Sequence, residues 1–429
     1  MTIQADRTEA VDRTGRTGSK VILISSDGHI GPRVVEDLRP YVPSQHLEAY
    51  DAWRAQDSGF GAAPNGEAKQ RQIERNLRTA GHHDVSARLR DMDEDGVTAE
   101  IVFHDSFNGE MMPFQGNGFF YQYEDRDLEL LGVGYDVYNR WLADALSPQP
   151  ARHVGLAYLP MWDVEAATAQ LPIAREMGLR AVNFPAPRPG LAEYDDPAWE
   201  PFWAACTDLD MPLVTHSGGA PIAFSGGPQR GSIYQIEGCG WLCRRAMHRM
   251  IFGGVFERHP RLKLVFAEIS SGWWPQALAE MDSSWASFSF ALRDQVPRHP
   301  SEYANAHVFL GYSFPAPFEV DEAVQGGFFE KTMWGSDYPH PEGTWQMPEE
   351  GSPSSTHDAI RYACTGLSEA QVRSFLTDTA ASVFGFDLAE LDKVAQQINA
   401  PTMAEIQTPL ETFPERDYSL SFRTVGPWG

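Results

Sequence analysis

The sequence predicts an α/β fold of the (β/α)8 TIM-barrel class. Short apolar segments that suit buried strands alternate about eight times with helical segments between residues 20 and 386, and four of these strands end in His, Asp or Glu. Such alternation favours a parallel sheet covered by helices. We therefore expect a closed barrel in preference to an open sheet, with an insertion after the first strand and an extended C-terminal tail.

The predicted strands begin with apolar or small residues and are only four to seven residues long. Runs of this kind are typical of parallel strands that are buried on both faces. We expect strands at residues 21–26, 99–104, 154–159, 181–184, 212–216, 262–268, 307–311 and 332–336.

The segments between these strands have helical patterns. In residues 126–146, Leu and Tyr side chains recur every three or four positions, as one helix face requires. Gly178 is placed to end the amphipathic helix expected at residues 165–177. Asp196-Pro197 is typical of a helix start. We expect helices at residues 86–95, 126–146, 165–177, 196–209 and 238–257 and within 273–294.

Three parts of the chain are distinguished by their patterns. Residues 1–19 are polar and charged and are expected to form a flexible arm. Residues 20–399 should form the barrel, with a cap insertion at about 32–85 where no strong strand pattern occurs. Residues 400–429 contain four prolines and are expected to form an extended tail that wraps a partner subunit or the chain's own barrel.

The composition limits the classes of partner. The chain has 34 basic and 59 acidic residues, a net charge of −25, which argues against nucleic acid and anionic membranes as partners. The chain shows neither an apolar run of 18 residues nor a secretory signal, so we expect a cytoplasmic protein. No nucleotide-binding glycine motif occurs. The four cysteines are expected to be buried, inert thiols, with a redox or zinc pair at Cys239 and Cys243 as the alternative: Cys206, Cys239, Cys243 and Cys364.

Six candidate metal ligands stand at or just beyond the ends of four predicted strands. The carboxyl ends of barrel strands meet on one face, which is where such folds place active sites. Glu268 could instead pair with Arg244 or Arg245, and His340 could pack or bind substrate. The candidate ligands are Asp27, His29, His216, Glu268, Asp337 and His340.

Two segments, residues 258–268 and the sequence Trp334-Gly335-Ser336-Asp337-Tyr338-Pro339, resemble the amidohydrolase-related family of metal-dependent TIM barrels. That family includes decarboxylases, hydratases and hydrolases of small carboxylates. The resemblance implies that His216 and Asp337 match the family's ligands on the fifth and eighth strands. Asp27 and Glu268 stand where the family usually has histidines, and His340 is an additional donor.

This ligand set predicts two metal ions. Six donors are too many for one zinc ion. Three carboxylates around a single dication would also leave one negative charge uncompensated in a buried site, which is costly. Two bridged dications, iron or manganese, suit the oxygen-rich set. The pattern resembles carboxylate-rich dinuclear members of the fold, which implies an oxygenase that uses dioxygen to hydroxylate a small substrate such as an amino acid. Glu268 and His104 are the expected catalytic residues.

Two alternatives remain open. The first is a hydrolase or decarboxylase of a small carboxylate with one metal such as zinc, in which Glu268 is the general acid or base. The second is a non-catalytic barrel subunit that supports a related catalytic subunit. We also expect a homo-oligomer, or a hetero-oligomer with a related barrel. Carboxylate clamps for a substrate, or else surface ion pairs, are expected at Arg88, Arg90, Arg180 and Arg188.

Overall fold

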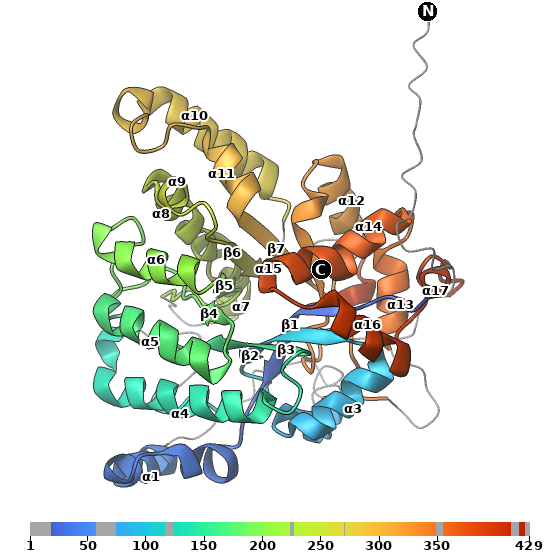
Figure 1. Cartoon of the computed structure of the whole chain (residues 1–429), viewed down its shortest axis with the longest axis horizontal. Helices are drawn as coiled ribbons and strands as arrows, with labels where there is room; N and C mark the ends of the chain where they lie inside the picture. Colours follow the sequence, from blue (N-terminus) through green and yellow to red (C-terminus); the bar gives the residue numbers. More distant parts are fainter. Residues whose placement is uncertain are drawn as a thin grey trace, which may run out of the picture.

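The computed structural model describes residues 19–56, 74–115, 123–223, 227–269, 271–348, 355–412 and 420–424. Within these ranges, eight parallel strands form one sheet in chain order, and helices surround it (Figure 1). The strands are β1 (Ile24–Ile30), β2 (Ala99–His104), β3 (His153–Ala157), β4 (Ala181–Asn183), β5 (Leu213–His216), β6 (Leu264–Ala267), β7 (Val308–Ser313) and β8 (Thr332–Gly335).

The first strand and the segment after the last strand close the sheet. Gly28 pairs in parallel with Tyr338. The His29 amide donates to the Tyr338 carbonyl at 2.6 Å, and the Asp337 amide donates to the Asp27 carbonyl at 3.0 Å. These bonds join β1 to the chain that follows β8, which confirms the predicted (β/α)8 TIM barrel.

The first strand lies further along the chain than the predicted residues 21–26. Its register with β2 shifts between Ser25 and Gly28, a bulge that lets the strand continue through the ligand motif to Ile30. The predicted strand at 99–104 coincides with β2. Pairing with β2 beyond the bulge therefore makes Asp27-Gly28-His29 part of the strand.

Helices follow most strands. The predicted helix at 238–257 is instead a series of shorter pieces, because a π-helical turn over Tyr234–Trp241 and Gly253-Gly254 interrupt it. The α-helices are α1 (Leu47–Gln56), α3 (Val85–Asp95), α4 (Leu128–Leu146), α5 (Val164–Met177), α6 (Glu200–Asp208), α7 (Arg230–Ile233), α8 (Arg245–Phe252), α9 (Val255–Arg258), α10 (Trp274–Leu292), α11 (Pro300–His307), α12 (Pro317–Gln325), α13 (Ser355–Ala363), α14 (Glu369–Arg373), α15 (Thr379–Phe384), α16 (Leu388–Gln397) and α17 (Met403–Ile406).

The helix before β2 shows how local sequence sets these boundaries. The Asp84 side chain accepts hydrogen bonds from the first amides of α3, and Gly96 ends the helix at φ 77°. Aspartate at an N-cap satisfies otherwise unbonded amides, and glycine adopts positive φ without strain. These two residues fix the position of Arg88, which lies on α3 and is fully buried.

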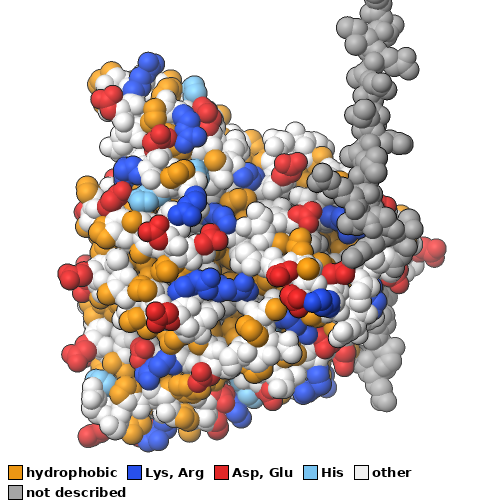
Figure 2. Space-filling view, in the orientation of Figure 1, with side chains coloured by type: hydrophobic (Ala, Val, Ile, Leu, Met, Phe, Trp, Pro, Cys, Tyr) orange, Lys and Arg blue, Asp and Glu red, His pale blue; other side chains and the backbone are white. Residues whose placement is uncertain are grey.

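The apolar core has two parts. Inside the barrel, one cluster joins small and branched residues of the strands to Phe384 of α15. A larger cluster fills the layer between strands and helices and includes Trp199 and Trp203, which are at most 1% exposed. On the outer surface, acidic and basic side chains are interspersed (Figure 2), as in the 2.9 Å pair of Arg258 with Glu200.

The terminal segments of the described chain contact its own barrel. The Val21 amide donates to the Pro401 carbonyl at 2.7 Å, and Arg423 pairs with Glu319 of α12. The arm predicted at residues 1–19 lies almost wholly outside the described residues, as do positions 57–73 of the predicted insertion and 413–419 and 425–429 of the tail. None of the described helices has the length and apolar character needed to cross a membrane.

Candidate metal centre

Four of the predicted ligands meet at the carboxyl ends of the strands. Asp27 and His29 lie two residues apart on β1, so their side chains point to the same face. His216 is the last residue of β5, and Asp337 follows β8 at φ 57°. We call these four side chains, Asp27, His29, His216 and Asp337, the four-donor cluster.

The donor atoms of this cluster approach one another closely. His29 Nε2 lies 3.2 Å from Asp27 Oδ1 and 3.3 Å from Asp337 Oδ1. His216 Nε2 lies 3.4 Å from the same Asp27 oxygen. Donors bound to one cation at about 2.1 Å lie about 3.0–3.4 Å apart in octahedral or tetrahedral geometry. The observed spacing therefore fits one shared ion.

Backbone carbonyls fix the tautomers of the two histidines. His29 Nδ1 lies 3.1 Å from the His104 carbonyl, and His216 Nδ1 lies 2.8 Å from the Ser217 carbonyl. A carbonyl can only accept, so each Nδ1 carries the proton. Each Nε2 is directed at the carboxylates, and on losing its proton it would offer its lone pair to a shared cation, which is the arrangement of metal-binding histidines.

The facing atoms of the cluster are buried and lack a hydrogen-bond partner. They are Asp27 Oδ1, His29 Nε2, His216 Nε2, and Asp337 Oδ1 and Oδ2. Buried polar atoms are normally paired, because an unpaired one costs free energy. These residues therefore fit a bound cation, and two triads among the predicted ligands could hold one: Asp27, His29 and His216, and His29, Asp337 and His340.

The charges of the cluster influence one another strongly. Burial opposes ionisation of Asp27, but His216 and His29 hold the pKa of this carboxyl well below its usual value. Burial acts in the same direction on Asp337, and His340 lowers the pKa of Asp337 despite it. Both aspartates therefore remain carboxylates, the form that binds a cation.

His340 contacts the cluster through Asp337. Its Nδ1 lies 2.9 Å from Asp337 Oδ1, and its Nε2 lies 2.9 Å from the Asp105 carbonyl. The His340 ring also stacks on His29 with centroids 3.9 Å apart. These contacts hold both Asp337 and His29 in place.

Glu268 lies beside the cluster and follows β6 at φ 54°. Its Oε2 accepts a hydrogen bond from Ser217 Oγ at 3.2 Å and lies 3.5 Å from His216 Nε2. Burial, followed by the charges of Asp337 and Asp27, raises the pKa of Glu268 well above its usual value. The alternative partners have other contacts, since Arg244 lies over Trp273 and Arg245 pairs with Glu193.

His104 contributes its backbone to the cluster, while its side chain faces the helices. The adjacent Phe103 points inward and packs against His29 and His216 at 5.6 and 4.7 Å. The His104 ring packs against Tyr138 of α4 at 5.1 Å, and burial lowers the pKa of His104 to about 4. Its catalytic role remains a prediction that this position does not favour.

Two features of the site were not predicted from the sequence: the contact of Ser313 with Asp27 and the burial of Arg88. Ser313, the last residue of β7, donates through Oγ to Asp27 Oδ2. Arg88, expected to clamp a substrate or lie at the surface, is buried and pairs with Glu100. One sequence signal was present: Gly28 between two ligands marks a close approach of other atoms to the strand.

The chain belongs to the amidohydrolase family, whose model matches residues 77–386. A gamma-resorcylate decarboxylase of Rhizobium sp. is 27% identical over 219 residues, 47% of this chain, and the match spans only 64% of that relative. A gamma-resorcylate decarboxylase of Rhodococcus jostii is 25% identical over 321 residues, covering 70% of this chain and 87% of the relative.

A solved structure shows the same fold. The 5-carboxyvanillate decarboxylase of Novosphingobium aromaticivorans, complexed with manganese and 4-hydroxy-3-methoxy-5-nitrobenzoic acid, superposes with a TM-score of 0.60. It is 18% identical, and the match covers 85% of this chain and 96% of that one.

These comparisons correct the predicted chemistry. The expected monooxygenase, with dioxygen as a partner, is wrong, because the relatives are named decarboxylases. Decarboxylases are lyases and not oxidoreductases, so the relatives support the decarboxylase alternative. The expected oligomer and the cytoplasmic location remain predictions.

Proposed function

We propose that this protein is a metal-dependent decarboxylase of a small hydroxylated aromatic carboxylate. The observation that carries the proposal is the four-donor cluster, whose buried facing atoms lack partners, in a family whose similar members are decarboxylases. The relatives' names supply the substrate class, since gamma-resorcylate and 5-carboxyvanillate are both phenolic acids.

The proposed site takes one divalent ion in place of the two expected from the number of donors. His29 belongs to both triads but has only one free nitrogen, because Nδ1 faces the His104 carbonyl. His340 Nε2 faces the Asp105 carbonyl, and its Nδ1 lies 2.9 Å from Asp337 Oδ1, so we assign His340 to support Asp337 and not to bind a second ion. The residues that would hold the ion are Asp27, His29, His216 and Asp337. Manganese suits these oxygen and imidazole donors. The 5-carboxyvanillate decarboxylase of similar fold is complexed with manganese.

The ion, when bound, would hold the substrate carboxylate and the neighbouring phenolic oxygen and stabilise negative charge on them. The chain's own residues determine the rest. His340 and Ser313 keep the two aspartates oriented. The apolar wall formed by Phe103 excludes water from one side, which strengthens electrostatic interactions within the site.

Glu268 is the proposed proton donor. In decarboxylation the bond between the ring carbon and the carboxylate breaks, carbon dioxide leaves, and the electron pair remains on the ring carbon. That carbon must then take a proton. Glu268 presents a carboxyl group beside His216, and Ser217 holds its Oε2, so its other oxygen can deliver the proton.

The test is a decarboxylation assay under strict anaerobiosis with manganese-loaded protein and a panel of hydroxybenzoates. We expect one manganese per chain by elemental analysis and release of one carbon dioxide per phenol formed. Neither quantity should change when oxygen is admitted. Two metals per chain together with oxygen-dependent turnover, or no carbon dioxide from any member of the panel, would contradict the proposal.

A further inference from the structure

A buried ion pair lies directly behind the first ligand strand. Arg88 of α3 is fully buried and donates from Nε and Nη2 to the two oxygens of Glu100 at 2.5 and 2.6 Å. Glu100 lies on β2 and also bonds His153 Nδ1 at 3.0 Å. We call Arg88, Glu100 and His153 the buried ion cluster.

The third nitrogen of the Arg88 guanidinium contacts the backbone of the proposed ligand His29. Nη1 donates to the carbonyl of His29 at 2.5 Å. The same guanidinium lies over the ring of Tyr338, 4.6 Å from its centroid. Tyr338 follows Asp337 directly, so one side chain contacts a proposed ligand and the neighbour of another.

These contacts lie on the seam that closes the barrel. The His29 amide donates to the Tyr338 carbonyl at 2.6 Å, and Asp337 and Asp27 are bonded through their backbones at 3.0 Å. Asp27 and His29 come from one side of this seam, and Asp337 comes from the other. A small shift across the seam would therefore separate the donors by the same amount.

Gly28 shows how closely the buried ion cluster is fitted to the ligand strand. A Cβ at this position would lie 2.8 Å from Glu100 Oε2 and 2.9 Å from Arg88 Nη2. Because side chains alternate along a strand, Asp27 and His29 point into the barrel while position 28 points at Arg88. The motif Asp27-Gly28-His29 thus combines two ligands with a site for the guanidinium.

Stability alone does not explain a buried ion pair here. Replacing such pairs with apolar residues of similar volume is often neutral or stabilising, because burying two charges is costly. A guanidinium that forks onto a carboxylate while a third nitrogen holds a carbonyl has a defined geometry, which an apolar side chain lacks.

We propose that Arg88 is a positioning residue that holds His29 and Asp337 in register for metal binding by clamping the seam between β1 and the segment after β8. The proposal rests on the metal site assigned above. Partners that orient ligands from behind typically change metal affinity 10- to 100-fold when they are altered.

The test measures Mn²⁺ affinity of the full chain by calorimetry, with the electron paramagnetic resonance spectrum of the bound ion as a second readout. Arg88→Lys keeps the charge opposite Glu100 but loses the fork, and we expect roughly 10- to 100-fold weaker binding and an altered spectrum. The double variant Arg88→Met/Glu100→Gln removes both charges and should weaken binding similarly. If the single variant fails to fold, the double variant decides.

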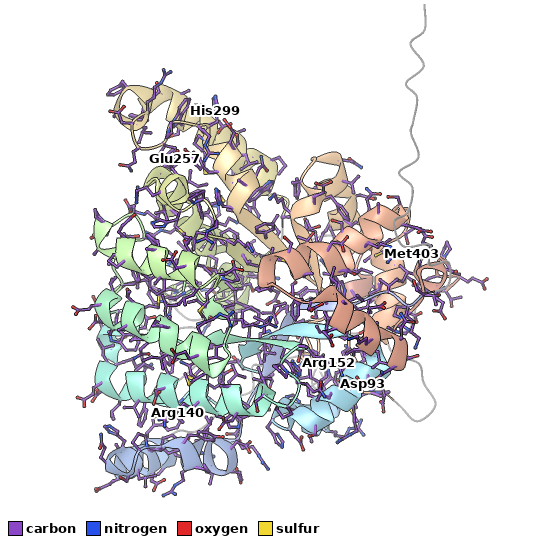
Figure 3. All side chains as sticks on the ribbon, viewed as in Figure 1. Asp93, Arg140, Arg152, Glu257, His299 and Met403 are labelled. Atoms are coloured by element: carbon purple, nitrogen blue, oxygen red, sulfur yellow. The ribbon has the colours of Figure 1, made fainter. Side chains whose placement is uncertain are left out.

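The matched control is Arg152→Lys. Arg152 is a second buried arginine; it donates to the carbonyls of Thr98 and Val97 at the amino end of β2 and pairs with Asp93 at 2.7 Å (Figure 3). This variant should bind Mn²⁺ as the wild type does. Unchanged affinity in the folded Arg88 variants, or equal weakening in Arg152→Lys, would overturn the proposal. Absence of Mn²⁺ binding by the wild type would instead refute the metal site itself.

Discussion

Two groups of buried charges, the buried ion cluster and the four-donor cluster, lie on opposite faces of β1 and differ in how they are neutralised. Behind the strand, Arg88 supplies the cation for Glu100 within hydrogen-bond distance. In front of it, the four-donor cluster contains two carboxylates whose facing oxygens have no hydrogen-bond partner. The chain therefore supplies the cation of the buried ion cluster itself, as Arg88. The four-donor cluster instead fits a cation taken from solution.

The largest expected effect comes from replacing a ligand of the four-donor cluster. Asp337→Asn keeps the side-chain shape but removes a charge, so Mn²⁺ affinity should fall by more than the roughly 100-fold typical of outer partners. Decarboxylation should become undetectable. Elemental analysis and a carbon dioxide assay measure these effects, with Asp208→Asn on the surface as the control. Full metal content in Asp337→Asn would remove Asp337 from the ligand set.

The difference between the two groups also explains what the sequence could predict. Asp27, His29, His216 and Asp337 were predictable because ligands at strand ends converge in any parallel barrel. The direction of His104 was not, because both faces of β2 are buried and no polar alternation marks the inner face. Arg88 was taken for a surface or substrate residue, since a sequence does not show which charge becomes enclosed.

The error about the reaction has a related cause. Six donors, with Glu268 and His340 among them, predicted two ions, and the resemblance of that set to dinuclear members of the fold implied an oxygenase. The structure shows Glu268 bonded to Ser217, and His340 braced between Asp337 and Asp105. Residue types at strand ends predict that a metal binds, but the number of ions depends on which atoms remain free.

A smaller effect should separate proton donation from metal binding. Glu268→Gln is expected to lower the rate of carbon dioxide release by about 10²- to 10⁴-fold, the range for loss of a general acid. Mn²⁺ content should stay at one per chain, because Glu268 is not in the four-donor cluster. Loss of the ion along with activity would show that Glu268 is a ligand and would bring it into the second charge group.

Removing the metal should lower the free energy of unfolding, because the folded four-donor cluster loses its bound ion. At a free Mn²⁺ concentration of 100 times Kd, binding should raise the free energy of unfolding by about 2.7 kcal/mol. Thermal unfolding of wild type with Mn²⁺ and with a chelator measures this gain, and Asp337→Asn should show little of it. Equal unfolding temperatures for the wild type under both conditions would mean that the folded state binds no Mn²⁺ at this concentration.

The smallest expected effect is on stability at acid pH and comes from Glu100 of the buried ion cluster. Burial opposes ionisation of Glu100, but Arg88 and His153 lower its pKa to about 2 from 4.5. The unfolded chain therefore binds up to one more proton between these pH values. The stabilisation is present above pH 4.5 and is lost as the pH falls toward 2, at up to about 1.4 kcal/mol per pH unit.

Glu100→Gln removes this titration, so its free energy of unfolding should depend less steeply on pH than that of the wild type. Denaturant unfolding between pH 3 and 4.5 with a chelator present measures both slopes. The low pKa values of Asp27 and Asp337 act equally in the two proteins and cancel in the difference. Glu165→Gln, on the exposed face of α5, should keep the wild-type slope. Identical slopes for Glu100→Gln and wild type would mean that Arg88 does not hold Glu100 ionised, and the two charge groups would then differ less than the structure indicates.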